Sequence, residues 1–185
     1  MKLLTVLVII FTLGFSHQSK AESLTEDAAL LKQAYDELQL RKRDGERQLK
    51  FVRAFPRRAR DFNRLFNSPS QDQLWDGSRY IFELEQLAQS QPNETFGLML
   101  QLASELKWAP DAPNYLQFVL MKMAIDNPFA FADQFAQLTE TQRSGVVNFL
   151  AKSNKGPAIG FHQFIEILNR INKTALAEEL SAGLR

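Results

Sequence analysis

Basic side chains are concentrated in one short part of the chain. Residues 41–64 contain ten Lys and Arg but only three Asp and Glu, so this segment carries a net charge of +7. Most of the ten are arginine, whose planar guanidinium matches the geometry of carboxylate and phosphate groups. The composition therefore makes this segment a candidate surface for an anionic partner.

Five of these basic side chains recur at intervals of three and four residues: Lys50, Arg53, Arg57, Arg60 and Arg64. On a helix this spacing forms one stripe, roughly opposite the apolar stripe of Phe55, Phe62 and Phe66. A helix from Arg43 to Arg64 would be about 30 Å long, at roughly 1.5 Å per residue. Pro56 lies inside the stripe and predicts either the first turn of a new helix or a kink in a continuous one. The candidate binding residues are therefore Arg43, Lys50, Arg53, Arg57, Arg60 and Arg64.

Three interpretations of this stripe remain open. It is a solvated face without a partner, or it pairs internally, or it binds an external anion. Internal pairing is an alternative because the other residues after position 21 carry a net charge of −8, and acids such as Glu83, Glu85 or Asp133 could reach the arginines. For an external partner we expect an acidic protein surface or anionic lipid headgroups. Nucleic acid is not expected, because the phenylalanines face inward instead of forming a stacking platform.

Few residues offer catalytic or metal-binding chemistry. The chain has no Cys, which excludes disulfides, thiolate metal sites and a Cys nucleophile. His162 and Glu166 are four residues apart and could supply two ligands, which is too few for a metal site. We therefore predict no metal, no cofactor and no enzyme. The alternatives are a cell-wall hydrolase that uses a lone carboxylate in a cleft and a purely structural envelope protein. Trp75, in an expected loop, is either an exposed binding residue or a cover for the core.

The hydrophobic periodicity is helical throughout residues 22–185. Residues Ser23–Glu26 form a capping-box pattern, and Leu31, Tyr35 and Leu38 continue one apolar face after it. Further helix starts are expected at Asn93, at Asp111–Pro113, at Asn127–Pro128, at Thr139 or Thr141, and at Gly156–Pro157. In the helix after Pro113, the side chains expected to face inward are Tyr115, Phe118, Val119 and Met123. Short links between helices predict an all-α fold, either a multi-helix bundle or a short α-solenoid of antiparallel helices.

The first 21 residues resemble a secretory signal peptide. Lys2 precedes an apolar run, residues 3–15, which is shorter than the roughly 20 residues of a membrane span. Ser19 and Ala21 then place small residues at −3 and −1 of a cut before Glu22. We expect cleavage to leave residues 22–185 as a single helical domain that is periplasmic or secreted and has no transmembrane span.

Two stretches resemble small exported all-helical bacterial proteins of unassigned function. They are Phe55-Pro-x₅-Phe62-x₂-Leu65-Phe66 and Lys107-Trp-x₂-Asp111-Ala-x-Asn114-x-Leu116-Gln117. The resemblance implies an all-helical fold and export, and it carries no catalytic residue. Together these observations predict an exported helical protein that acts by binding, for example an immunity or inhibitor protein, with the basic stripe as its surface.

Overall fold

The computed structural model describes residues 25–66, 74, 77–153 and 156–185. Within these ranges every regular element is an α-helix, which confirms the all-α prediction. The expected signal peptide, the predicted cap at Ser23 and the loop residue Trp75 lie outside the described residues. In the described part of the chain, no helix combines the length and apolar character needed to cross a membrane.

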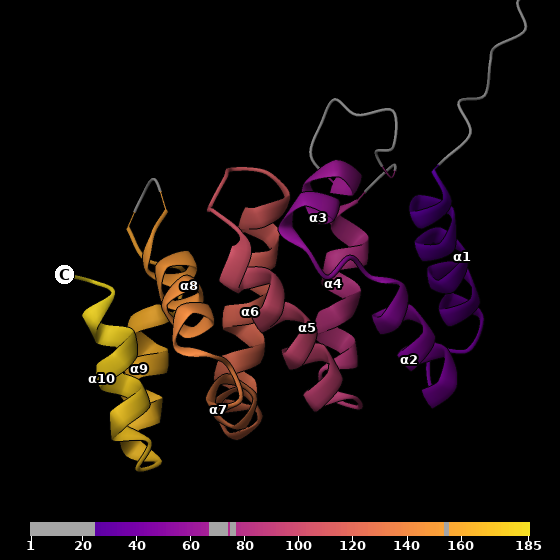
Figure 1. Cartoon of the computed structure of the whole chain (residues 1–185). Coiled ribbons are helices and arrows are strands. Elements are labelled where there is room, and N and C mark those ends of the chain that lie inside the picture. The colour runs from indigo at the N-terminus through magenta and orange to yellow at the C-terminus, as the bar shows by residue number, and fades with distance from the viewer. Residues whose placement is uncertain (1–24, 67–73, 75–76, 154–155) are drawn as a thin grey trace, which may run out of the picture.

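The ten helices follow one another across the molecule in chain order, from α1 at one end to α9 and α10 at the other (Figure 1). Their bounds are α1 Glu26–Leu40, α2 Gly45–Ala54, α3 Ala59–Phe66, α4 Ser78–Leu87, α5 Pro92–Glu105, α6 Ala112–Asp126, α7 Pro128–Ala136, α8 Glu140–Ala151, α9 Phe161–Arg170 and α10 Thr174–Ala182. The helices pack as a multi-helix bundle with one continuous hydrophobic core.

The centre of the core is formed by α5 and α6, because both helices bury side chains over much of their circumference. The most extensive contact in the bundle is that of α5 with α8. Gly145 of α8 makes this close packing possible: a Cβ at this position would overlap the carbonyl oxygen of Ser104 and lie 2.9 Å from the carbonyl carbon. The two helix backbones therefore touch where any larger side chain would separate them.

Several helix starts follow the sequence patterns. Thr139 forms a complete capping box with Gln142, and Asn127 accepts a hydrogen bond from the backbone N–H of Ala130. Other starts differ. The fifth helix begins at Pro92 instead of after Asn93, since Pro is already preorganised for the first helical turn. The first begins after Thr25, and Gly160 (φ 87°) precedes α9 in place of Gly156–Pro157.

The predicted orientation of the sixth helix is partly wrong. Val119 and Met123 are buried as expected, but Tyr115 and Phe118 are exposed. Their rings lie on the side of α6 that faces α4, where Tyr115 contacts Phe82 edge-on with ring centroids 5.7 Å apart. This helix is apolar on nearly every face, so its periodicity did not define which aromatic side chains face the core.

Candidate binding site

Pro56 splits the basic segment into two helices. The backbone leaves α2 at Phe55, passes through Pro56 and Arg57, and enters α3 at Ala59. The backbone N–H of Ala59 donates a hydrogen bond of 3.0 Å to the Glu105 carboxylate. A second break separates α1 from α2, and Asp44 caps α2 by accepting hydrogen bonds from two backbone N–H groups. The predicted binding residues therefore do not share one helix.

We call α1, α2 and α3 with their connecting links the N-terminal layer, and the six predicted binding residues are divided among four places in it. Arg43 lies in the loop before α2, Lys50 and Arg53 lie on α2, Arg57 lies in the link, and Arg60 and Arg64 lie on α3. The aromatic stripe behind them is buried as predicted, with Phe55, Phe62 and Phe66 in the core. The sequence thus identified which side of the segment faces solvent, although it did not resolve the helix boundaries.

Half of the ten basic side chains form ion pairs, four of them with acids of the N-terminal layer and one with an acid of α4. Lys50 donates to Glu37 at 2.7 Å, and Arg64 donates to Asp27 at 2.5 Å and lies 3.7 Å from Asp61. The remaining contacts are Lys42 with Glu83, Arg47 with Asp44 and Arg60 with Asp61. Internal pairing is therefore extensive, and it is mainly local.

The three acids named as candidate internal partners of the arginines pair with lysines. Glu83 is buried and accepts hydrogen bonds from Gln39 and Lys42, so it pairs with a lysine of the basic segment. Glu85 pairs with Lys122, and Asp133 with Lys173. The alternative in which these three acids pair with arginines is therefore not found in the structure. Arg64 pairs instead with Asp27 of α1 and with Asp61 of its own helix.

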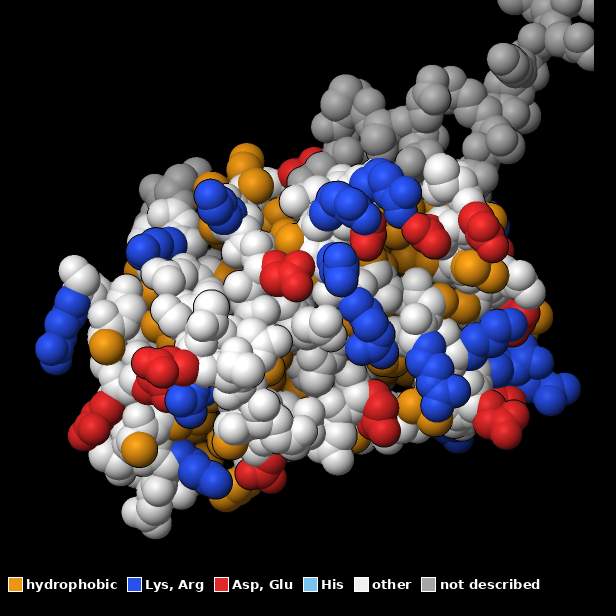
Figure 2. All heavy atoms as spheres, in the orientation of Figure 1, with side chains coloured by type: hydrophobic (Ala, Val, Ile, Leu, Met, Phe, Trp, Pro, Cys, Tyr) orange, Lys and Arg blue, Asp and Glu red, His pale blue; other side chains and the backbone are white. Residues whose placement is uncertain are grey.

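Three exposed arginines beside the break at Pro56 form what we call the arginine patch: Arg53, Arg57 and Arg58. Within the described ranges of the chain, none of the three makes an ion pair or a side-chain hydrogen bond. Arg41 and Arg43, in the loop before α2, are exposed in the same way. Figure 2 shows Lys and Arg side chains gathered over α2 and α3, with acidic side chains between them.

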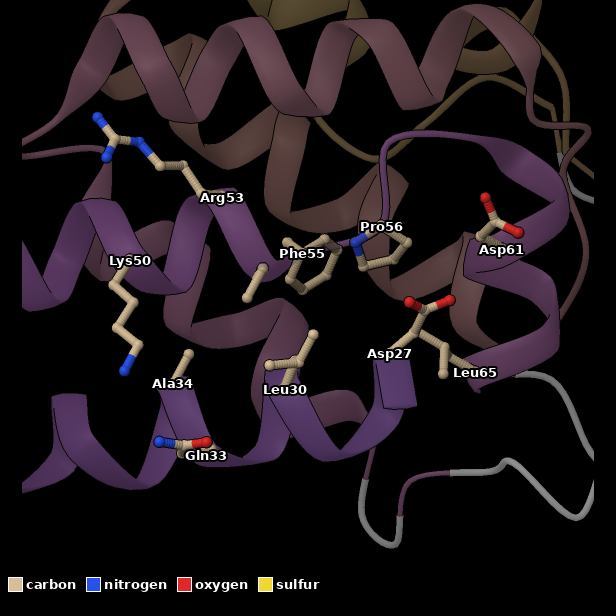
Figure 3. A pocket seen from close by; sticks show the side chains of 11 residues that line it. Asp27, Leu30, Gln33, Ala34, Lys50, Arg53, Phe55, Pro56, Asp61 and Leu65 are labelled. Atoms are coloured by element: carbon tan, nitrogen blue, oxygen red, sulfur yellow. The ribbon is translucent and has the colours of Figure 1, made fainter. Parts of the chain in front are cut away.

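A groove of about 590 Å³ runs between α1 on one side and α2 with α3 on the other. We call it the N-terminal groove. Figure 3 shows Leu30 and Phe55 at its middle, Lys50 on one side of them, and Asp27 with Asp61 on the other. Its complete lining is Asp27, Leu30, Gln33, Ala34, Lys50, Arg53, Ala54, Phe55, Pro56, Asp61 and Leu65. The middle is apolar and both ends carry charge.

Ion pairs connect the two walls of the N-terminal groove at both ends. The Lys50–Glu37 pair joins α2 to α1, and the Arg64–Asp27 pair joins α3 to α1. The hydrogen bond from Lys50, with a second one from Gln33, holds the pKa of the Glu37 carboxyl below its ordinary value. The two ion pairs thus bridge the groove at its ends and leave its apolar middle unbridged.

The groove contains two carboxylates, Asp27 and Asp61, which bears on the hydrolase alternative. Glycoside hydrolysis needs one carboxyl group as a proton donor and a second as a base or nucleophile. Here both carboxylates contact the guanidinium of Arg64, an arrangement that suits an ion-pair network. His162 and Glu166 are exposed on α9, where Glu166 lies 3.8 Å from Arg170. No cluster of three or more His, Asp or Glu that could hold a metal is found among the described residues.

Sequence reasoning missed Leu30, whose side chain is 51% exposed at the rim of the groove. The sequence does contain a signal for this residue. Leu30 is apolar, but it lies outside the apolar helix face that contains Ala28, Leu31 and Tyr35. What distinguishes Leu30 from other exposed apolar side chains such as Leu40 is that it lines the N-terminal groove.

Comparison with known proteins gives no match, since no family model, no curated protein and no solved structure is significantly similar to this chain. The resemblance of residues 55–66 and 107–117 to exported helical proteins therefore stays a prediction.

Proposed function

We propose that this chain is an exported helical binding protein that uses the arginine patch to dock an acidic protein surface. A periplasmic immunity or inhibitor protein, which occludes an enzyme acting on the cell envelope, is a concrete form of this function. The observation that carries the proposal is the exposure of Arg53, Arg57 and Arg58 without an intramolecular ion pair in the described part of the chain.

Neighbouring acids favour a protein partner over a lipid surface. Glu37, Asp27 and Asp61 lie among the basic side chains of the same layer. On a membrane these carboxylates would lie against a continuous layer of anionic headgroups, and the resulting charge repulsion would weaken binding. The acidic side chains of a protein surface are separated from one another, so individual carboxylates can pair with individual arginines. Charge complementarity of this kind also speeds the encounter of two proteins at low salt.

Affinity capture from an envelope extract tests the proposal. The bait is the chain from residue 22, and the test variant replaces Arg53, Arg57 and Arg58 by Gln. The control variant removes the same number of charges from the other end of the molecule, by Lys152→Gln, Arg170→Gln and Arg185→Gln. All six side chains are exposed, so both variants are expected to fold.

We expect the native form and the control to capture one acidic protein at low salt, and the patch variant to lose it. High salt should weaken capture, because exposed charges are screened. Equal capture by all three forms would contradict the proposal. Binding of the native form to vesicles of phosphatidylglycerol in phosphatidylcholine, lost in the patch variant, would assign the patch to a membrane surface instead.

A further inference from the structure

We infer that the N-terminal groove holds a short segment of the acidic partner in which an apolar side chain stands next to an acidic one. This inference rests on the proposed function and adds the part of the partner that is recognised. It follows from three properties of the groove: its apolar middle, its bridged ends, and the position of Arg53 at its edge.

The middle of the groove is lined by apolar side chains. Phe55 and Leu65 are buried in its floor, whereas Leu30 is half exposed at the rim. The space exists because the facing positions are small: Ala34 of α1 and Ala54 of α2 stand where a larger side chain would fill it. At about 590 Å³ the volume lies within the roughly 300–1,000 Å³ of small-ligand pockets, so it suits a few side chains of a partner.

Most basic groups at the ends of the groove are already paired, so few of them can bind a negatively charged ligand. Lys50 is already bound to Glu37, and Arg64 to Asp27 and Asp61. Among the basic side chains that line the groove, only Arg53 has no acid partner within the described residues. Arg53 points away from α1 in Figure 3, so its guanidinium stands at the outer edge of the groove.

A matching ligand is therefore apolar in the middle and anionic toward α2. An apolar side chain that enters between Leu30 and Phe55 places the next residue of its chain over α2, where a carboxylate meets Arg53 and then the remaining arginines of the patch. Contact with Leu30 and Phe55 provides affinity through burial, and the arginines select the acidic neighbour. An acidic surface without a protruding apolar side chain leaves the groove empty.

Two synthetic peptides of equal length and charge test the inference. One alternates Asp and Phe, and the other alternates Asp and Ser. Each is titrated into the chain from residue 22 and into four variants, with fluorescence anisotropy of the labelled peptide as the measurement. Leu30→Gln removes the exposed apolar contact, and Leu40→Gln is its control, because Leu40 is an exposed leucine at the far end of the same helix. Ala54→Leu fills the groove, and the arginine-patch variant removes the charge.

We expect the Asp/Phe peptide to bind at least about tenfold more tightly than the Asp/Ser peptide, since burial of one Phe side chain is worth about that factor. Leu30→Gln and Ala54→Leu should remove most of this difference, while Leu40→Gln should preserve it. The patch variant should weaken both peptides. Circular dichroism of each variant establishes that it is folded.

Other outcomes separate failure of the inference from failure of the proposed function. Equal binding of both peptides, still dependent on the patch, would overturn the groove as a ligand site and leave the proposed function intact. No patch-dependent binding of either peptide would overturn both. Self-association of the native chain that is lost in Leu30→Gln, measured by sedimentation, would show a second copy in the groove and overturn its assignment to a partner segment.

Discussion

Two groups of aromatic side chains stabilise opposite parts of the molecule. The N-terminal aromatic cluster consists of Tyr35, Phe51, Phe55, Phe62, Phe66 and Tyr80. The C-terminal aromatic cluster consists of Phe96, Phe131, Phe135 and Phe164. In both clusters the closest buried Phe pair has ring centroids 4.9 Å apart, Phe62 with Phe66 in one and Phe131 with Phe164 in the other.

The two clusters differ in what surrounds them. Phe131 lies at the centre of the second cluster, enclosed by α5, α7 and α9. In the first cluster, Phe55 forms part of the floor of the N-terminal groove, and the helices above it are joined by exposed ion pairs. Aromatic side chains pack closely in both places, but in the N-terminal layer the cluster also borders a groove, which has the exposed Leu30 at its rim and Arg53 in its lining. This combination is the reason that we propose a binding site there.

The largest effect on stability should come from removing the centre of the enclosed cluster. Phe131→Ala deletes a fully buried ring with three aromatic neighbours and should lower the free energy of unfolding by about 3–5 kcal/mol. Phe55→Ala should cost less, about 3 kcal/mol, because its cavity opens into the groove and can fill with water. Urea unfolding of both variants measures the difference. A larger loss of unfolding free energy for Phe55→Ala than for Phe131→Ala would contradict the expected difference between the two clusters.

A smaller loss is expected where the backbones of α5 and α8 touch. Gly145→Ala places a Cβ against the backbone of Ser104 and should cost about 1–3 kcal/mol in unfolding free energy, because the helices must move apart. Gly97→Ala, in the interior of α5, is the control: its Cβ would meet only the end of the Gln134 side chain, at 3.3 Å. That variant should be neutral or stabilised by about 0.5–1 kcal/mol through helix propensity. Equal losses in the two variants would show that this contact does not limit the packing.

The fold class could be read from the sequence because the apolar residues recur with helical spacing through most of the chain. The division of the basic segment into separate helices could not be predicted from the sequence. Asp44–Gly45 and Pro56 are each compatible with either a kink or a break in the helix. Tertiary contacts, such as the hydrogen bond between Glu105 and the start of α3, decide between the two. The site was foreseen as basic and solvent-facing. The groove was not foreseen, because it depends on how far α1 stands from α2, which local sequence does not specify.

The smallest effect concerns the ion pair at one end of the groove. Lys50→Gln should raise the pKa of Glu37 toward its ordinary value of 4.5, because it removes the strongest hydrogen bond to the carboxylate. In the native chain the folded-state pKa of Glu37 is lowered, so the pair stabilises the fold above that ordinary value, and the stabilisation is lost as the pH falls through the folded-state pKa. Carboxyl-detected NMR titration measures the pKa.

Lys32→Gln is the matched control for this titration. Lys32 pairs with Asp36 on the same helix and is not among the groups that shift Glu37. The pKa of Glu37 should be unchanged in that variant. An identical pKa of Glu37 in the native chain and in Lys50→Gln would show that the Lys50–Glu37 pair does not form in solution. One end of the groove would then not be bridged.

Site-specific photo-crosslinking tests the central claim, that a protein partner docks on the N-terminal layer, most directly. A photoreactive amino acid replaces Leu30 at the groove, Arg57 in the patch, Tyr115 on the exposed aromatic surface of α6, or His162 on α9, and each chain is irradiated in an envelope extract. We expect one acidic protein to be crosslinked from positions 30 and 57 and not from positions 115 and 162. A partner crosslinked from position 115 or 162, with none from 30 and 57, would contradict it.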